Sequence, residues 1–284
     1  MPCPPDLNNV FPNMPTPPCD CPCEDFSDNP VRYANGEIRL VEDDLQAAGF
    51  GNFWSHVRTW GNQMSNAYDG PNGFNWFSRD LPYLAQFEGA ESAYVVMGDA
   101  NNALWFDPAP NGGFLARFGQ KTTLAIDPAT SNFLLTGLDG SVTEFNGVSS
   151  AHPLLFKKYT DPAGNVTAVT AYSDGEINTI ERTCVVNSVP TKQLLTYDFD
   201  ETFSRLTTLT LQSGPSAGPL ANVFQVRYTY TGDDLDDNDG NLETVQQFSW
   251  QNGQWQSLGT TYYRYDDGHA LKFVVRPQGY SDLV

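Results

Sequence analysis

Short runs of alternating apolar and β-branched residues, separated by turn residues, recur from about residue 92 to residue 275. No helical pattern of 10–15 residues intervenes between them. This spacing predicts an all-β fold of successive antiparallel hairpins rather than parallel βαβ units. The predicted strands cover residues 93–97, 103–106, 114–118, 122–126, 133–136, 142–145, 154–159, 166–172, 177–182, 194–199, 206–212, 223–231, 242–250, 255–265 and 271–275.

The residues between these runs have the chemistry of tight turns. Four Asp-Gly or Asn-Gly pairs separate predicted strands, and glycine supplies the positive φ that hairpin turns need. These pairs are Asp139-Gly140, Asp174-Gly175, Asn252-Gly253 and Asp267-Gly268.

Net charge excludes two classes of partner. The chain has 34 acidic and 15 basic residues, a formal charge of −19, which repels nucleic-acid phosphates and anionic lipid. We therefore expect no nucleic-acid binding. No apolar stretch approaches the length of a membrane span, so we also expect no membrane insertion. Aromatic residues make up 13% of the chain and charged residues only 17%, a composition that favours folding over disorder.

Three regions follow from changes in composition. Residues 1–28 form a Pro/Cys-rich leader that we expect to be flexible. Residues 29–90, called the aromatic segment below, are rich in Gly, Asn and aromatic residues, and only 42–48 looks briefly helical. Residues 91–284 are the predicted hairpin region.

The cysteines leave the redox compartment open. The run Cys19-Asp-Cys-Pro-Cys23 lacks the Cys-x2-Cys spacing of zinc ribbons and has no histidine nearby. Disulfides or thiols in a flexible leader therefore explain it better than a metal site does. Cys184 is expected to be a small buried apolar residue.

A loose repeat runs through the hairpin region: an aromatic residue, an acidic turn, glycine, then a Thr/Val/Leu strand. In this pattern the aromatic residue packs on a neighbouring unit, and each unit buries its face by stacking on the next. The copies are Tyr159-Thr-Asp-Pro-Ala-Gly-Asn-Val-Thr167, Tyr172-Ser-Asp-Gly-Glu-Ile-Asn-Thr-Ile180, Tyr197-Asp-Phe-Asp-Glu-Thr-Phe-Ser-Arg-Leu-Thr207 and Tyr265-Asp-Asp-Gly-His-Ala-Leu271.

These copies resemble the YD-repeat, or RHS-repeat, family, whose unit reads roughly Tyr-Asp-x-x-Gly-Arg-Leu-Thr. The stretch Asn29-Pro-Val-Arg-Tyr-Ala-Asn-Gly-Glu-Ile-Arg-Leu40, followed by Gly70-Pro-Asn-Gly-Phe-Asn-Trp76, is similar to the segment that precedes the repeats in large bacterial members. The resemblance covers about residues 29–284. It implies a spiral of β-hairpins that in complete members forms a hollow shell around a C-terminal cargo, on exported or surface proteins. This chain has few, irregular repeats and is too short to close such a shell.

The densest acidic run is the one candidate for a metal site. Asp234, Asp236, Asp237 and Asp239 could offer oxygens to calcium, although the EF-hand register fails because Leu235 and Gln246 fall at ligand positions. A solvated acidic loop is the simpler interpretation. No other cofactor is expected.

The remaining candidate residues do not form a known catalytic motif. His56, His152 and His269 lie far apart, and neither a nucleophile elbow nor a phosphate loop occurs. We therefore expect no enzyme activity and no catalytic residues; a glycosidase would need two carboxylates in a concave cleft. A different class of function, an extracellular carbohydrate-binding module or adhesin, would use exposed tryptophans. The six tryptophans are Trp54, Trp60, Trp76, Trp105, Trp250 and Trp255.

The main expectation is a structural, non-enzymatic segment of an exported or surface-associated protein. Its partners would be the remainder of a larger polypeptide or other copies of itself, and the alternative function adds polysaccharide. Its location would be extracellular or at the cell surface. The last predicted strand would then leave a sheet edge to be covered.

Overall fold

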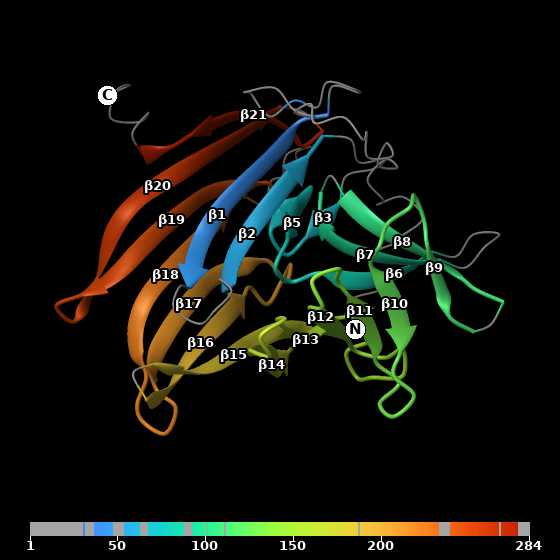
Figure 1. Ribbon diagram of the computed structural model, residues 1–284. Coiled ribbons are helices and arrows are strands. Elements are labelled where there is room, and N and C mark those ends of the chain that lie inside the picture. The colour runs from blue at the N-terminus through green and yellow to red at the C-terminus, as the bar shows by residue number, and fades with distance from the viewer. Residues whose placement is uncertain are drawn as a thin grey trace.

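The computed structural model describes residues 31, 37–47, 54–62, 68–87, 93–100, 102–110, 112–186, 188–232, 239–266 and 268–277. Every named element in these residues is a β-strand, and the 21 strands form four antiparallel sheets (Figure 1). The predicted all-β class is confirmed. None of the described residues belongs to a helix long and apolar enough to cross a bilayer.

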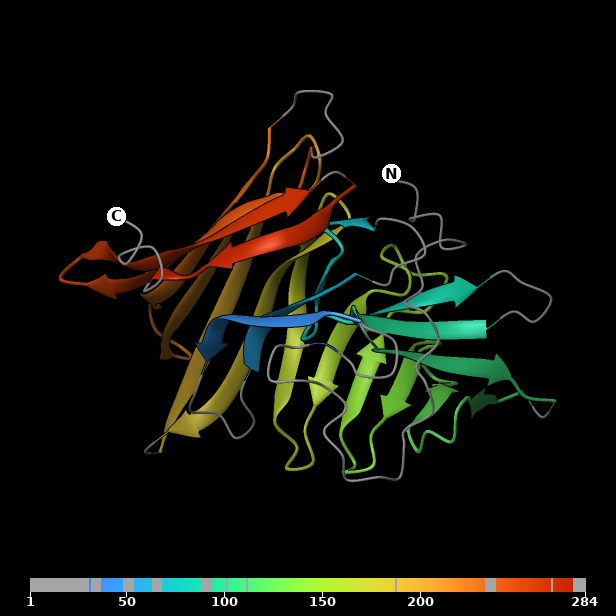
Figure 2. The same ribbon diagram turned by 90° about the horizontal axis from the view of Figure 1, so that it is seen from above.

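The largest sheet has twelve strands in strict chain order, each antiparallel to the next. It bends into a curved wall (Figure 2). Its strands are β10 (Thr123–Ile126), β11 (Phe133–Thr136), β12 (Val142–Phe145), β13 (Phe156–Thr160), β14 (Val166–Ser173), β15 (Glu176–Val186), β16 (Val189–Phe199), β17 (Leu206–Pro215), β18 (Ala221–Tyr230), β19 (Leu242–Gln251), β20 (Gln254–Asp266) and β21 (Ala270–Val275).

Turn chemistry fixes the register of these hairpins. Asp174-Gly175 joins β14 to β15 and Asn252-Gly253 joins β19 to β20, with positive φ at all four residues, as type I′ turns require. In the longer β16–β17 turn, the Asp200 carboxylate accepts hydrogen bonds from the backbone N–H groups of residues 202, 203 and 205. Three of the four predicted Asp-Gly or Asn-Gly turns therefore lie where the chain reverses, and the fourth includes Asp267, which lies outside the described residues.

The aromatic segment supplies all the strands of two smaller sheets and the first strand of a third. One sheet joins β1 (Arg39–Ala47), β2 (Trp54–Gly61) and β5 (Trp76–Ser78), and another joins β3 (Asp69–Gly70) and β4 (Gly73–Phe74). The four-stranded sheet continues past residue 90, with strands β6 (Tyr83–Phe87), β7 (Ala93–Asp99), β8 (Asn102–Pro108) and β9 (Phe114–Ala116).

The short helix expected at 42–48 is wrong, because residues 42–47 belong to β1. β1 pairs with β2 along its whole length, with a bulge between Asp43 and Leu45. The bulge turns the Asp44 side chain into the interior, where it forms an ion pair with Arg58. A partner on another strand thus overrode the local pattern.

β1 and β2 lie across the inner side of the curved sheet, in front of β16–β19 (Figure 1). The main hydrophobic core forms at this contact, where Trp54, Trp60 and Trp76 pack with apolar residues of the large sheet. The sheet contributes Phe156, Ile180, Leu195, Tyr197, Leu209, Leu211, Val226, Tyr228, Val245 and Tyr263.

A separate core joins the four-stranded sheet to the first strands of the large one. Phe106 of β8 is fully buried with Phe133 of β11 and Phe145 of β12. The large sheet is therefore covered on its inner side by different parts of the preceding chain.

Candidate functional site

Most of the predicted metal ligands fall outside what can be described. Asp234, Asp236 and Asp237 lie outside the described residues, as do the leader cysteines, and Asp239 stands just before the β18–β19 turn glycine. Within the described ranges, no three His, Cys, Asp or Glu side chains gather closely enough to hold a metal ion. The calcium site stays a prediction. Cys184 is half-buried rather than buried, because it lies near the turn of the β15–β16 hairpin, where it pairs with Thr191.

The tryptophans do not form a flat exposed platform. Trp54, Trp60, Trp76 and Trp105 are all buried. Trp250 and its cross-strand partner Trp255 are half-buried, and their rings meet at 70° with centroids 5.0 Å apart. Sugar-binding faces need rings exposed along one plane, so this arrangement favours packing over sugar stacking.

The repeat tyrosines point to the aromatic segment. Tyr159 lies 6.5 Å from Trp54, Tyr197 lies 5.7 Å from His56, and the Tyr265 hydroxyl accepts a 2.9 Å hydrogen bond from the Trp76 indole N–H. The expectation that each unit buries its face only on the next unit therefore needs correction. Three of the four repeat units instead pack their tyrosine against β2 or β5. These two strands and β1 form the sheet on the inner side of the large sheet, called the inner layer below.

Arg58 of β2 is the polar centre of this interface. It is fully buried and binds the Asp44 carboxylate through Nε and Nη2, the latter at 2.9 Å. Tyr228 donates to the same carboxylate at 2.9 Å, and Arg58 Nη2 donates to the Tyr263 hydroxyl at 3.1 Å. The guanidinium carbon also stands 4.3 Å from the centre of the Trp76 ring. Two strands of the inner layer and two of the large sheet thus share one buried ion pair.

Arg205 performs a related task at the other end of the same interface. Its guanidinium forms a 2.8 Å ion pair with Asp69 and lies about as close to the Phe74 ring (5.5 Å) as to the Tyr230 ring (5.4 Å). His269 stacks on Phe74 with centroids 3.5 Å apart. The β3–β4 hairpin is therefore held by aromatic and charged groups of the large sheet.

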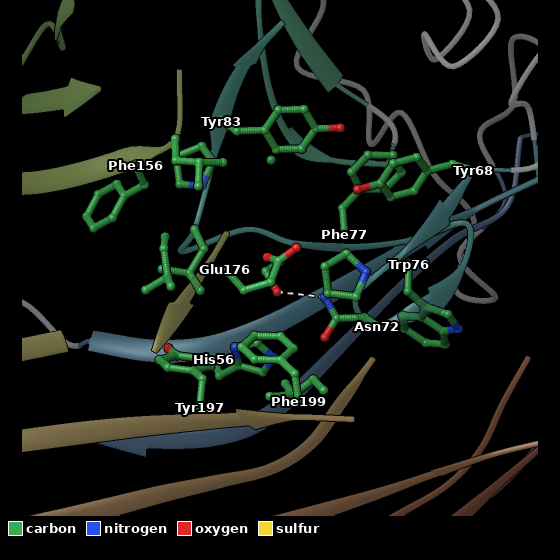
Figure 3. A pocket seen from close by; sticks show the side chains of 18 residues that line it. His56, Tyr68, Asn72, Trp76, Phe77, Tyr83, Phe156, Glu176, Tyr197 and Phe199 are labelled. Atoms are coloured by element: carbon green, nitrogen blue, oxygen red, sulfur yellow. Dashed lines mark hydrogen bonds between the residues drawn. The ribbon is translucent and has the colours of Figure 1, made fainter. Parts of the chain in front are cut away.

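A pocket of about 100 Å³ lies between the inner layer and strands β15–β17. Figure 3 shows Glu176 reaching into it, with His56 and Tyr197 on one side and Tyr83 on the other. Its walls are mostly apolar and include no lysine or arginine. They comprise His56, Tyr68, Pro71, Asn72, Trp76, Phe77, Ser78, Leu81, Pro82, Tyr83, Gly98, Leu155, Phe156, Glu176, Ile177, Tyr197, Phe199 and Leu206.

Burial changes the acid–base properties of the groups in this pocket. It lowers the pKa of His56 to about 4, against a weaker opposing effect of the Asp44 charge, so the imidazole is neutral at pH 7. Burial raises the pKa of the Glu176 carboxyl and raises that of the Tyr68 hydroxyl to about 12. A carboxyl group with a raised pKa and a neutral imidazole therefore share one small, largely apolar space.

Sequence reasoning did not identify this pocket. His56 belongs to no catalytic motif in the sequence, and Glu176 is one residue of a repeat copy. The Asp174-Gly175 turn predicts a strand over 177–182, directly after Glu176, but the nearness of Glu176 to the aromatic segment depends on how the curved sheet wraps around that segment. No local pattern carries that information.

No family model and no curated protein matches the sequence. Among solved structures, a chain of the TcdB2-TccC3-Cdc42 crystal structure aligns with a TM-score of 0.53 at 10% identity, covering 82% of this chain and 16% of that chain. The N-terminal domain of the effector protein SpvB from Salmonella typhimurium strain LT2 aligns with a TM-score of 0.40 at 12% identity, covering 83% of this chain and 97% of that domain. The first alignment shows a shared fold, which is consistent with the resemblance to RHS/YD-repeat proteins. This chain spans only a small part of that neighbour's length.

Proposed function

We propose that this chain is a structural, non-enzymatic segment of a larger RHS/YD-type protein, in which it forms part of a β-shell or presents a surface. The observation that carries the proposal is the single twelve-stranded meander, whose inner face is filled by the aromatic segment. Such an arrangement builds an extended curved wall with a rigid lining. Its chemistry is that of packing, through one buried ion pair and many aromatic contacts.

The β21 end of the large sheet is consistent with a position inside a longer assembly. Among the described residues, β21 pairs with β20 on one side and has no strand on the other. An unpaired strand edge is a template for another strand. The fold neighbour is itself far longer than this chain. A continuing polypeptide, or a second copy, would satisfy the open backbone groups of β21.

The negative charge suits an exported or surface-associated wall. Acidic residues occupy the hairpin turns, including Asp139, Asp161, Asp174 and Asp200, where several cap backbone N–H groups. Charge at the rims keeps strand ends soluble and discourages unwanted pairing. The extracellular location itself rests on the family resemblance.

Two measurements test this proposal: the reading frame downstream of this sequence, and the accessibility of the protein at the cell surface. We expect the reading frame downstream of residue 284 to encode further YD-type hairpins, and we expect protease added to intact cells to degrade the protein. A stop codon directly after Val284, together with a monomer in light scattering and full protection from protease, would contradict both parts. Binding to a glycan array would instead favour the carbohydrate-binding alternative.

A further inference from the structure

The pocket beside Glu176 has the size of a small-molecule site. An apolar cavity of about 150 Å³ holds benzene. The volume of about 100 Å³ here suits a ligand of roughly four to six non-hydrogen atoms. The inner layer, the four-stranded sheet and the large sheet all contribute walls, so the space exists only in the assembled fold.

The walls favour a positive charge. Rings of Tyr68, Phe77, Tyr83 and Phe156 surround the Glu176 side chain (Figure 3). The faces of aromatic rings carry negative potential and attract cations, most strongly where water is excluded. The lining includes no lysine or arginine that would compete for these faces.

Glu176 lacks a counter-charge. Its carboxylate makes no hydrogen bond or ion pair with any described residue. Burial is the sole cause of its raised pKa, which means that no neighbouring cation stabilises the charged form. The side chain is half-buried, so its charge is partly desolvated, and a bound cation would offset that cost.

Two further polar groups in the lining have unused hydrogen-bonding capacity. His56 is 1% exposed and interacts with the buried Asn72 side chain, which leaves the second ring nitrogen of His56 without a partner. The Asn72 amide nitrogen donates to Ser78 Oγ at 2.9 Å, which leaves the oxygen as acceptor (Figure 3). The neutral imidazole of His56 has one acceptor nitrogen, which is the second acceptor in the pocket. Both can receive the N–H groups of an ammonium ion.

We infer that this pocket binds a small alkylammonium ion, with Glu176 as its counter-charge, aromatic rings around its alkyl part and His56 and Asn72 as acceptors. The positive charge of the ligand pairs with the Glu176 carboxylate, its N–H groups donate to His56 and Asn72, and its alkyl part packs against the aromatic rings. The inference is independent of the structural role proposed above, since a wall can perform that role with its pocket empty.

Calorimetric titration of the full chain with n-butylammonium chloride tests the inference at constant ionic strength. n-Butanol is the matched probe, with the same alkyl chain and no charge. We expect the ammonium to bind at least about tenfold more tightly than the alcohol, because only the ammonium can pair with the Glu176 charge in a space bordered by aromatic rings. Equal affinities, or no detectable binding of the ammonium, would overturn the inference.

The variant Glu176→Gln assigns the binding to this pocket. It should lose at least about tenfold in ammonium affinity, while Glu201→Gln, an exposed charge in the β16–β17 turn, should bind like wild type. Unchanged affinity in Glu176→Gln would place the ligand elsewhere and overturn the assignment. If Glu176→Gln does not fold, the comparison of ammonium with alcohol on the wild-type protein decides alone.

Discussion

Arg58 joins both parts of the chain through one buried guanidinium group. It binds Asp44 beside it on the paired strand and Tyr263 on the large sheet. Removing one partner of a buried ion pair leaves the other charge uncompensated, whereas replacing both with apolar groups is far less costly. The energy of this centre therefore depends on keeping the pair complete.

The variant Arg58→Met should lower the free energy of unfolding by about 3–5 kcal/mol. The double variant Arg58→Met/Asp44→Leu should recover much of that loss, because the unpaired carboxylate is gone. Urea unfolding followed by tryptophan fluorescence measures both. A single variant that costs less than about 1 kcal/mol, within the range of an exposed pair, would contradict a buried role.

His56 should make the fold sensitive to acid. Its pKa falls from 6.5 to about 4 on folding, so its stabilising contribution is complete above pH 6.5 and is lost as pH falls toward 4. The variant His56→Phe keeps a ring against Tyr197 and Tyr228 without titrating. Relative to wild type, it should gain up to about 3 kcal/mol between pH 6.5 and 4. A constant difference over that range would contradict the buried neutral imidazole.

Asp80 provides the control of opposite sign. Burial raises its pKa from 3.8 to about 6, outweighing the hydrogen bonds that it accepts from Ser55 and the Val57 N–H. Its contribution is therefore present below pH 3.8 and lost as pH rises through 6. Relative to wild type, Asp80→Asn should become less stable as pH falls from 6 toward 4. If the stability of both variants followed the same pH dependence as that of the wild type, neither pKa shift would exist.

At the scale of elements, two turn glycines allow the cost of backbone strain to be distinguished from the cost of a packing clash. Gly253, in the β19–β20 turn, and Gly240, before β19, have nearly equal φ values of 78° and 74°. A Cβ at Gly253 would meet no atom within 4 Å, whereas a Cβ at Gly240 would lie 2.0 Å from Arg205 Nη2. Arg205 has little room to withdraw, because it is buried between Phe74 and Tyr230.

The variant Gly253→Ala should cost about 1–2 kcal/mol, the strain of a left-handed residue alone. Gly240→Ala should cost clearly more, because it also displaces Arg205 from its ion pair with Asp69. Thermal unfolding of the two variants gives the comparison, and the matched φ values remove the backbone contribution. Equal losses would mean that Arg205 contributes nothing to the position of the β3–β4 hairpin.

Elements with local signals could be predicted from the sequence. The hairpin strands and the Asp174-Gly175 and Asn252-Gly253 turns follow from period-two patterning and glycine chemistry. The strand at β1 and the pocket around Glu176 could not be predicted, since both depend on partners far away in the chain, such as Tyr228 for Asp44. The repeat tyrosines show the same limit, because their spacing was evident but their contact with the aromatic segment was not.

At the scale of the whole molecule, the inner layer and the curved sheet share one core. Trp54, Trp60 and Trp76 of the inner layer are buried by residues from β13 to β20. Neither layer could bury these faces alone, and shared burial makes unfolding cooperative. The account's central claim is therefore that the aromatic segment and the hairpin sheet form one structural unit.

Hydrogen–deuterium exchange of the full chain in increasing urea tests this claim most directly. We expect the backbone amides of β1 and β2 to lose protection at the same urea concentration as those of β16–β19, because removing the inner layer exposes the core of the sheet. The claim would be contradicted if β16–β19 stayed protected after β1 and β2 had exchanged.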